Sequence, residues 1–181
     1  LIAAFLFSDN QRPVQTPSTP VSVSASSTTF PLAQSSRQQA CAWLLRTQRA
    51  DGAWDAEAHG GRPQFTVGVT GLALMALAQN PSENAPALDR ATEFLLQSQT
   101  PNGRFGPAGH AALYNHGLAL NGLLQRRAAL PLSQANQLDP AIDRAVAFLQ
   151  SAQSENGGWG YRGTPNETPN GVVTAWQVLA L

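Results

Sequence analysis

The residues best suited to chemistry form one short cluster, Tyr114-Asn115-His116. A tyrosine hydroxyl can donate a proton and a neutral imidazole can accept one, so Tyr114 and His116 are the candidate catalytic residues. The alternative is structural: Tyr114 and Asn115 would cap a helix, and His116 would hydrogen-bond an adjacent turn. Both interpretations place the cluster at the head of a helix, so the surrounding elements must decide between them.

A second polar cluster, Asp55, Glu57 and His59, lies in the stretch DAEAH. Side chains at alternate positions converge on a metal ion only where the backbone is extended, and a solvated loop is the simpler interpretation. Cys41 is the single cysteine, which excludes an intramolecular disulfide and a Cys-rich zinc site. We therefore expect no metal and no cofactor.

The charge balance excludes one class of partner. The 181 residues carry 11 basic and 11 acidic side chains, for a formal net charge of zero, and 43% of them are hydrophobic. Nucleic-acid binding domains present a basic surface, so no nucleic acid is expected as a partner.

The first 35 residues differ in composition from the rest. Residues 1–7 (LIAAFLF) are wholly apolar, but a bilayer span needs about 20 such residues. We interpret them as the trailing end of a transmembrane or signal segment, the alternative being a stray hydrophobic terminus. Residues 8–35 are rich in Pro, Ser and Thr, which predicts a flexible linker. The prediction is a membrane-anchored or exported protein, associated with a membrane through its N-terminus, with the side of the membrane undetermined.

An internal repeat occupies residues 36–181. Three stretches share the pattern aromatic-Leu-x-x-x-Gln-x-x-x-Gly-x-aromatic, and their Gln residues follow one another after 51 and 54 residues. The pattern supplies the structural repeat residues Gln48, Gly52, Trp54, Gln99, Gly103, Phe105, Gln153, Gly157 and Trp159.

Each copy predicts a helix hairpin. The first helix is amphipathic, ends at the glycine, and is covered by the aromatic residue two positions later. The second helix is apolar nearly all round, as in residues 69–77, which predicts burial on every side. Alternating strand patterns are absent from these repeats. We predict an all-α fold, with helices beginning after about Ser35 and amphipathic outer helices surrounding buried inner ones.

The third copy carries the residues of a known pattern, Arg144-Ala145-x-x-Phe148-Leu149-x-x-x-Gln153-x-x-x-Gly157-x-Trp159. It resembles the QW motif of squalene–hopene cyclases and other triterpene cyclases, whose fold is similar to that of prenyltransferase β subunits. The fragments LYNHGLAL and GGWGYRG are similar to uncharacterised bacterial cyclase-like repeat proteins. The resemblance implies an α/α toroid of about six hairpins around an apolar cavity, of which this chain holds three.

The resemblance also implies a ligand and a mechanism. Cyclases of this family protonate an isoprenoid with an aspartic acid in a D-x-D-D-T-A motif at the head of an inner helix. The corresponding windows here are residues 66–71, 112–117 and 170–175, and none contains an acid. Asn115, Tyr161 and Trp176 are the candidate ligand-binding residues for an isoprenoid or other apolar small molecule.

Two functions therefore remain open. The first is a terpene-cyclase or prenyltransferase-like repeat domain with an apolar cavity. If it is an enzyme, it would be a triterpene-cyclase-type isomerase or lyase with its acid in sequence outside these residues. The alternative is a non-catalytic, membrane-proximal toroid that binds a ligand or protein. Because three hairpins are half of what closure requires, we also expect the chain to aggregate or pair through the apolar residues 172–181.

Overall fold

A computed structural model describes residues 31–181 of the chain, and the predictions for residues 1–30 lie outside this part. The described residues form seven α-helices and two short 3-10 turns, with no strand among them. The predicted all-α fold is confirmed. No helix in residues 31–181 is both long and apolar enough to cross a bilayer.

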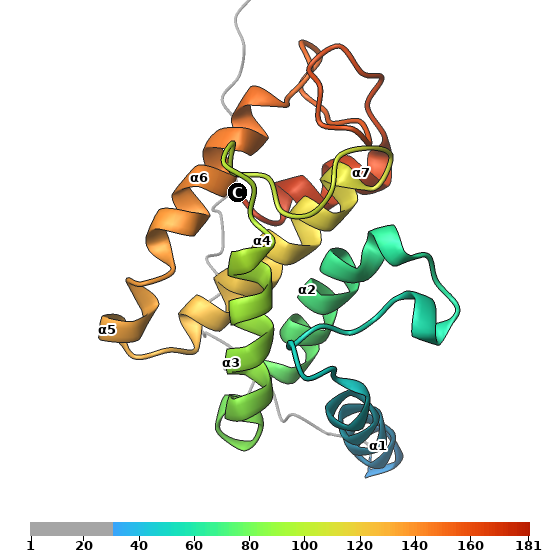
Figure 1. The fold of residues 1–181 in the computed structure, drawn as a ribbon, viewed down its shortest axis with the longest axis vertical. Coiled ribbons are helices and arrows are strands. Elements are labelled where there is room, and N and C mark those ends of the chain that lie inside the picture. Colours follow the sequence, from blue (N-terminus) through green and yellow to red (C-terminus); the bar gives the residue numbers. More distant parts are fainter. Residues whose placement is uncertain (1–30) are drawn as a thin grey trace, which may run out of the picture.

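The long helices follow one another along the chain as three pairs, each with an outer helix followed by an inner one (Figure 1). The outer helices are α1 (Pro31–Thr47), α3 (Pro81–Gln97) and α6 (Asp139–Ser151), and the inner helices are α2 (Thr66–Leu77), α4 (Ala112–Ala128) and α7 (Gly171–Val178). The four-residue helix α5 (Leu132–Ala135) lies in the connection between the second and third hairpins. The first helix begins at Pro31, inside the segment assigned to the linker, because proline is well tolerated in the first helical turn.

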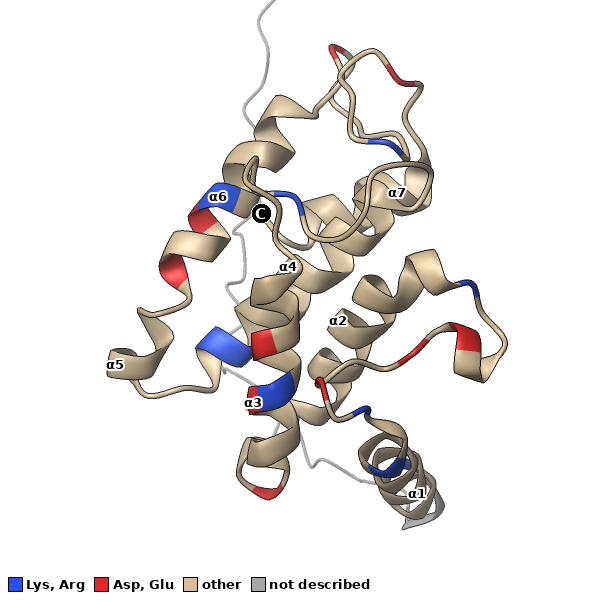
Figure 2. Ribbon diagram, viewed as in Figure 1, with Lys and Arg blue, Asp and Glu red and all other residues tan. Residues whose placement is uncertain are grey.

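The two sets of helices differ in charge as the hairpin pattern predicts. Acidic and basic side chains lie on α1, α3 and α6 and on the turns, whereas α2 and α7 carry none (Figure 2). On α4 the charged residues are Arg126 and Arg127, in its last turn. The inner helices are thus suited to contacts with one another.

Close contact between inner helices depends on glycine. A Cβ atom on Gly71 of α2 would lie 2.4 Å from the carbonyl oxygen of Leu118 in α4. The facing Gly122 of α4 would place its Cβ 2.8 Å from the Gly71 carbonyl. A methyl group at either position would push the two backbones apart, so these glycines fix the distance between α2 and α4.

The inner helices are not all buried on every side, and here the sequence-based expectation is wrong. Leu118, Leu120 and Leu123 of α4 are buried, but Leu72 of α2 is 39% exposed and Val178 of α7 is 60% exposed. The reason is position in the array: α4 packs against both α2 and α7, whereas each of these has an inner-helix neighbour on one side.

The aromatic residue of each repeat folds back over its outer helix as predicted. Trp54, Phe105 and Trp159 are all buried in the core. The indole N–H of Trp54 donates to the Leu44 carbonyl at 2.8 Å, and that of Trp159 donates to the Leu149 carbonyl at 2.9 Å. These bonds satisfy the polar tip of a large buried ring at the ends of α1 and α6.

Candidate functional site

The repeats are held together by a hydrogen-bonded joint built on the motif glutamine. The Nε2 atom of Gln48 donates to the Gly52 carbonyl at 3.0 Å and to the Ala87 carbonyl at 2.9 Å. Arg90 donates to Oε1 of Gln48 at 2.6 Å. One amide therefore joins its own turn to the outer helix of the next repeat.

The same joint recurs one repeat later. Gln99 donates to the carbonyls of Gly103 at 3.1 Å and Ala141 at 2.8 Å, and it accepts from Arg144 at 2.6 Å. At both joints the glycine has a φ of +91°, and a Cβ there would lie 2.1 Å from the carbonyl oxygen of the arginine. Only glycine meets both conditions. The six repeat residues of the first two copies thus have a structural role.

The heads of the inner helices are also equivalent in the three repeats. The backbone N–H groups of Trp54, Phe105 and Trp159 each donate to a side chain near the start of the following inner helix. The acceptors are Thr70 Oγ1 at 3.1 Å, His116 Nδ1 at 3.2 Å and Thr174 Oγ1 at 3.0 Å. His116 therefore stands where the other repeats have threonine, which supports the alignment of the three acid-free windows.

The structure buries His116 completely. Its ring stacks on Phe105 with a centroid separation of 5.7 Å and meets Phe148 edge-on at 4.9 Å. Burial lowers the pKa of His116 to about 4; the carbonyl of Ala145 opposes this effect, and Arg104 adds to it. Among residues 31–181, no group meets the geometry of a hydrogen bond to its Nε2 atom. The ring of His116 thus lies within the packing between repeats, where Phe148 of the next outer helix covers it.

Tyr114 and Asn115 also lie within the packing between repeats. Tyr114 is half-buried and meets Phe65 edge-on at 6.1 Å. Asn115 is buried: its Oδ1 accepts from the Gly68 N–H at 2.9 Å, and its Nδ2 donates to the Gln64 carbonyl at 2.7 Å. Asn115 thus caps the neighbouring helix α2, whereas the sequence-based alternative placed it at the cap of its own helix.

The other two ligand candidates do not join this cluster. Tyr161 is 41% exposed, and its carbonyl accepts from the Leu113 N–H at 2.9 Å. Trp176 is half-buried, and its carbonyl accepts from Asn121 at 3.0 Å. Neither Tyr161 nor Trp176 lines the apolar pocket that the structure contains in its first hairpin.

That apolar pocket has a volume of about 210 Å³ and lies in the first hairpin. Its wall is formed by Trp43, Leu44, Trp54, Asp55, Ala56, His59, Gly61, Phe65 and Val69. The ring of Trp43 meets that of His59 edge-on at 4.8 Å, which resembles the contact of Phe148 with His116. Sequence reasoning missed this pocket because it treated Trp43 as a repeat residue and His59 as part of a solvated loop.

The polar residues beside the pocket make local bonds. The pKa of the Asp55 carboxyl is lowered, chiefly because the Glu57 N–H donates to it, with further help from the Ala58 N–H and from Arg49. Within residues 31–181, no three or more His, Cys, Asp or Glu side chains gather closely enough to hold a metal ion. Asp55 is therefore a loop-organising carboxylate that is ionised at neutral pH.

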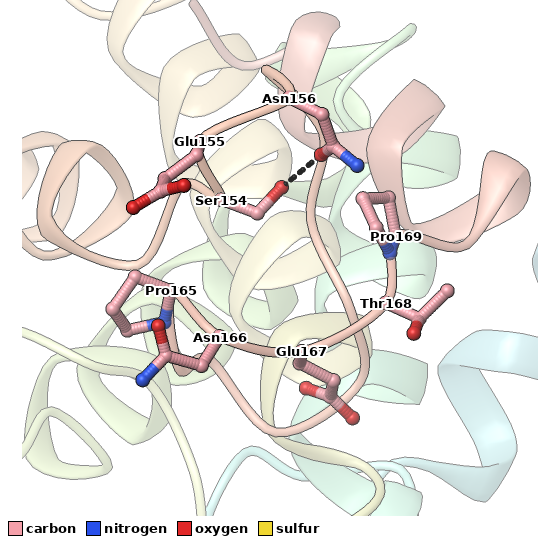
Figure 3. A pocket seen from close by; sticks show the side chains of 8 residues that line it. All are labelled: Ser154, Glu155, Asn156, Pro165, Asn166, Glu167, Thr168 and Pro169. Atoms are coloured by element: carbon pink, nitrogen blue, oxygen red, sulfur yellow. Dashed lines mark hydrogen bonds between the residues drawn. The ribbon is translucent and has the colours of Figure 1, made fainter.

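A larger polar depression lies between α6 and α7 (Figure 3). Its volume is about 410 Å³, and it is lined by Ser154, Glu155, Asn156, Pro165, Asn166, Glu167, Thr168 and Pro169. The Ser154 hydroxyl donates to Asn156 Oδ1 at 2.5 Å, and Glu167 accepts from the Arg162 N–H at 2.6 Å. These bonds organise the two loops that form its wall.

Comparison with known proteins identifies the family. The family model described as the squalene-hopene cyclase C-terminal domain matches residues 63–181. The chain belongs to this family. The predicted resemblance to squalene–hopene cyclases is thereby confirmed.

Two curated relatives agree with this assignment. A drimenyl diphosphate synthase from Streptomyces showdoensis is 28% identical over 143 residues, which cover 77% of this chain and 25% of the relative. A squalene–hopene cyclase from Zymomonas mobilis is 29% identical over 176 residues, covering 82% of this chain and 26% of the relative. The chain spans about a quarter of the length of the cyclase-type relatives it matches.

Proposed function

We propose that this terpene-cyclase-like domain binds an isoprenoid chain in the apolar pocket beside Trp43, Trp54 and Phe65. The observation that carries the proposal is the wall of that pocket, which is apolar and aromatic in a member of a cyclase family. Aromatic faces offer large contact area to a hydrocarbon chain, and their negative faces favour developing positive charge. At about 210 Å³ the pocket suits one end of such a chain, because whole-ligand pockets have roughly 300–1,000 Å³.

Neither Asp55 in the pocket wall nor His116 at the head of α4 is suited to donate the proton for a cyclisation. A protonating acid must be neutral at working pH, but the lowered pKa of Asp55 keeps this pocket carboxyl ionised. His116 is buried and, with a pKa of about 4, is neutral and holds no spare proton at pH 7. We therefore propose that residues 31–181 bind an isoprenoid and that any acid for turnover lies outside them.

The same observation favours a second candidate function. A hairpin array that has an apolar pocket and no acid in its three helix-head windows also suits a non-catalytic toroid that holds an apolar ligand beside a membrane. Product analysis separates the two candidates, because both predict binding and only an enzyme predicts turnover.

Binding is tested by calorimetric titration of the purified 181-residue chain with farnesyl diphosphate, with inorganic diphosphate as the headgroup control. We expect saturable binding of farnesyl diphosphate alone and a loss of at least about tenfold in affinity for Trp43→Ala, which removes part of the pocket wall. Leu132→Ala is the matched control, because Leu132 is 78% exposed and does not line the pocket.

Two results would contradict the proposal. Equal affinities of Trp43→Ala and the unchanged chain would show that the ligand does not bind in this pocket. Absence of binding would show that isoprenoid diphosphates are not ligands of the chain. Gas chromatography of the same mixtures tests the acid. We expect no cyclised product, and a product would show that the 181-residue chain contains a proton donor that the three windows do not reveal.

A further inference from the structure

The wall of the apolar pocket combines aromatic rings with one acidic side chain. Trp43 of α1 and His59 of the loop before α2 meet edge-on with a centroid separation of 4.8 Å. Phe65 and the buried ring of Trp54 complete the aromatic part of the wall. Asp55 is its acidic residue, and no arginine lines it. Aromatic rings and one carboxylate thus surround a volume of about 210 Å³.

The pocket is built within one hairpin. Its residues come from α1, from the loop between α1 and α2, and from Val69 of α2. The close contact between α2 and α4 involves Gly71 and Leu118, and neither of these residues lines the pocket. A ligand in the pocket would therefore contact an outer helix, an inner helix and the loop that joins them.

Asp55 gives this wall a negative charge. Its Oδ1 accepts from the Glu57 N–H at 2.9 Å, and its Oδ2 lies 3.2 Å from Nη1 of Arg49. Arg49 also pairs with Asp51 at 2.8 Å, and its side chain is 51% exposed. The arginine charge is therefore shared between two carboxylates and screened by water. A carboxylate that loses water to a ligand regains that free energy only from an opposite charge or a hydrogen-bond donor. An isoprenoid chain offers neither, so the Asp55 charge is a feature of the wall that such a chain does not use.

We propose that the pocket binds a compact methylated ammonium group, as in choline, with the Asp55 carboxylate as its counter-ion. Aromatic faces attract cations, and the face of tryptophan does so most strongly. The methyl groups would contact the rings of Trp43, Trp54 and Phe65, whereas a primary ammonium is strongly hydrated and would lose more on entering an apolar wall. The pocket is smaller than the roughly 300–1,000 Å³ of whole-ligand sites, which suits a single headgroup. This ligand carries no isoprenoid chain, so the inference goes beyond isoprenoid binding and does not depend on it.

Calorimetric titration of the 181-residue chain with choline tests the proposal. The comparison ligand is 3,3-dimethylbutan-1-ol, which has the shape of choline with carbon in place of the charged nitrogen. We expect saturable binding of choline and at least about tenfold weaker binding of the neutral alcohol. The titration is run at pH 8, because an imidazolium ring at His59 would repel the ligand. Absence of choline binding, or equal affinities for the two ligands, would overturn the proposal.

A methylated ammonium group occurs both on free molecules and on lipid headgroups, and a second measurement distinguishes these sources. The chain is sedimented with phosphatidylcholine vesicles, and phosphatidylglycerol vesicles are the control. Sedimentation with phosphatidylcholine alone, reversed by free choline, would assign the group to a lipid headgroup. Choline binding without such sedimentation would assign it to a free ligand.

The variant Asp55→Asn tests the counter-ion. It removes the charge and keeps an oxygen that can accept from the Glu57 N–H, and circular dichroism checks that the fold is retained. We expect choline to bind about fivefold more weakly or worse to this variant, and with unchanged affinity to Leu132→Ala, which lies outside the pocket. Equal choline affinities of Asp55→Asn and the unchanged chain would overturn the proposal. Neither titration contains an isoprenoid, so a failure here is distinct from a failure of isoprenoid binding.

Discussion

At the head of α4, the imidazole of His116 accepts a backbone hydrogen bond, as the hydroxyls of Thr70 and Thr174 do in the other two repeats. Unlike threonine, histidine is titratable, and here it is fully buried. Burial lowers its pKa from 6.5 to about 4, so the folded chain binds fewer protons than the unfolded chain between these values. The stability linked to neutral His116 is therefore present above pH 6.5 and is lost as pH falls towards 4.

This pKa difference predicts a measurable pH dependence. Between pH 7 and pH 4 the unfolded chain takes up a proton on His116 that the folded chain does not. This difference lowers the free energy of unfolding by about 3 kcal/mol. Urea unfolding at several pH values measures this loss. His116→Thr, which restores the residue found in the other two repeats, is expected to flatten the profile over this window. An unchanged profile in the variant would mean that other groups carry the pH dependence.

At the scale of single elements, much of the fold was predictable from the sequence. The repeat pattern predicted the three hairpins, the glycine ends of the outer helices and the return of Trp54 and Trp159 over those ends. The bonds that return these tryptophans over the helix ends join residues 10 positions apart. Local patterns indicate them because the interacting groups lie on the same turn or on adjacent turns.

Features that depend on a neighbouring repeat were not predictable in this way. The burial of His116 results from Phe148, which lies on the next outer helix, and Asn115 caps α2 in the previous repeat. A single sequence carries no signal of which distant side chain will cover a given one. The candidate site was therefore placed on the correct helix end, but its side chains point into the packing between repeats.

Contact between two inner helices depends on Gly71, and this gives a prediction at the element scale. Alanine is favoured over glycine in a helix by about 1 kcal/mol, but a Cβ at position 71 would lie 2.4 Å from the Leu118 carbonyl. We expect the clash to dominate, so that Gly71→Ala lowers the free energy of unfolding by about 1–3 kcal/mol. Chemical denaturation measures the change.

Gly171 in the first turn of α7 is the matched control for this prediction. A Cβ there meets no atom within 4 Å, so only the helix preference remains. Gly171→Ala is expected to leave the chain equally stable or slightly more stable. If both variants were destabilised equally, the close approach of α2 and α4 would not be the cause.

At the scale of the whole molecule, the apolar end at α7 predicts self-association. Val172, Val178, Leu179 and Leu181 are between 58% and 67% exposed. Grouped apolar side chains of this size favour burial against another surface. We expect light scattering to show dimers or larger species whose population falls when Val178 and Leu179 are both replaced by serine. If the chain stayed monomeric at high concentration, these exposed apolar side chains would not drive self-association, and the prediction would be wrong.

Within residues 31–181 the glutamine of the repeat makes contacts between repeats at Gln48 and Gln99, but at Gln153 it bonds only within its own turn. Gln48 and Gln99 each join two repeats through three hydrogen bonds, whereas Gln153 has one bond within its own turn. Each lost bond of this kind costs about 0.5–1.5 kcal/mol, and more where an arginine is the donor. The three glutamines therefore provide an internal comparison at equivalent positions.

The most direct measurement is the free energy of unfolding of Gln48→Ala, Gln99→Ala and Gln153→Ala under identical conditions. We predict losses of about 2–4 kcal/mol for the first two variants and less than about 1 kcal/mol for the third. Equal losses at all three positions would contradict the account, because they would show that the glutamine stabilises its own turn and does not join the repeats.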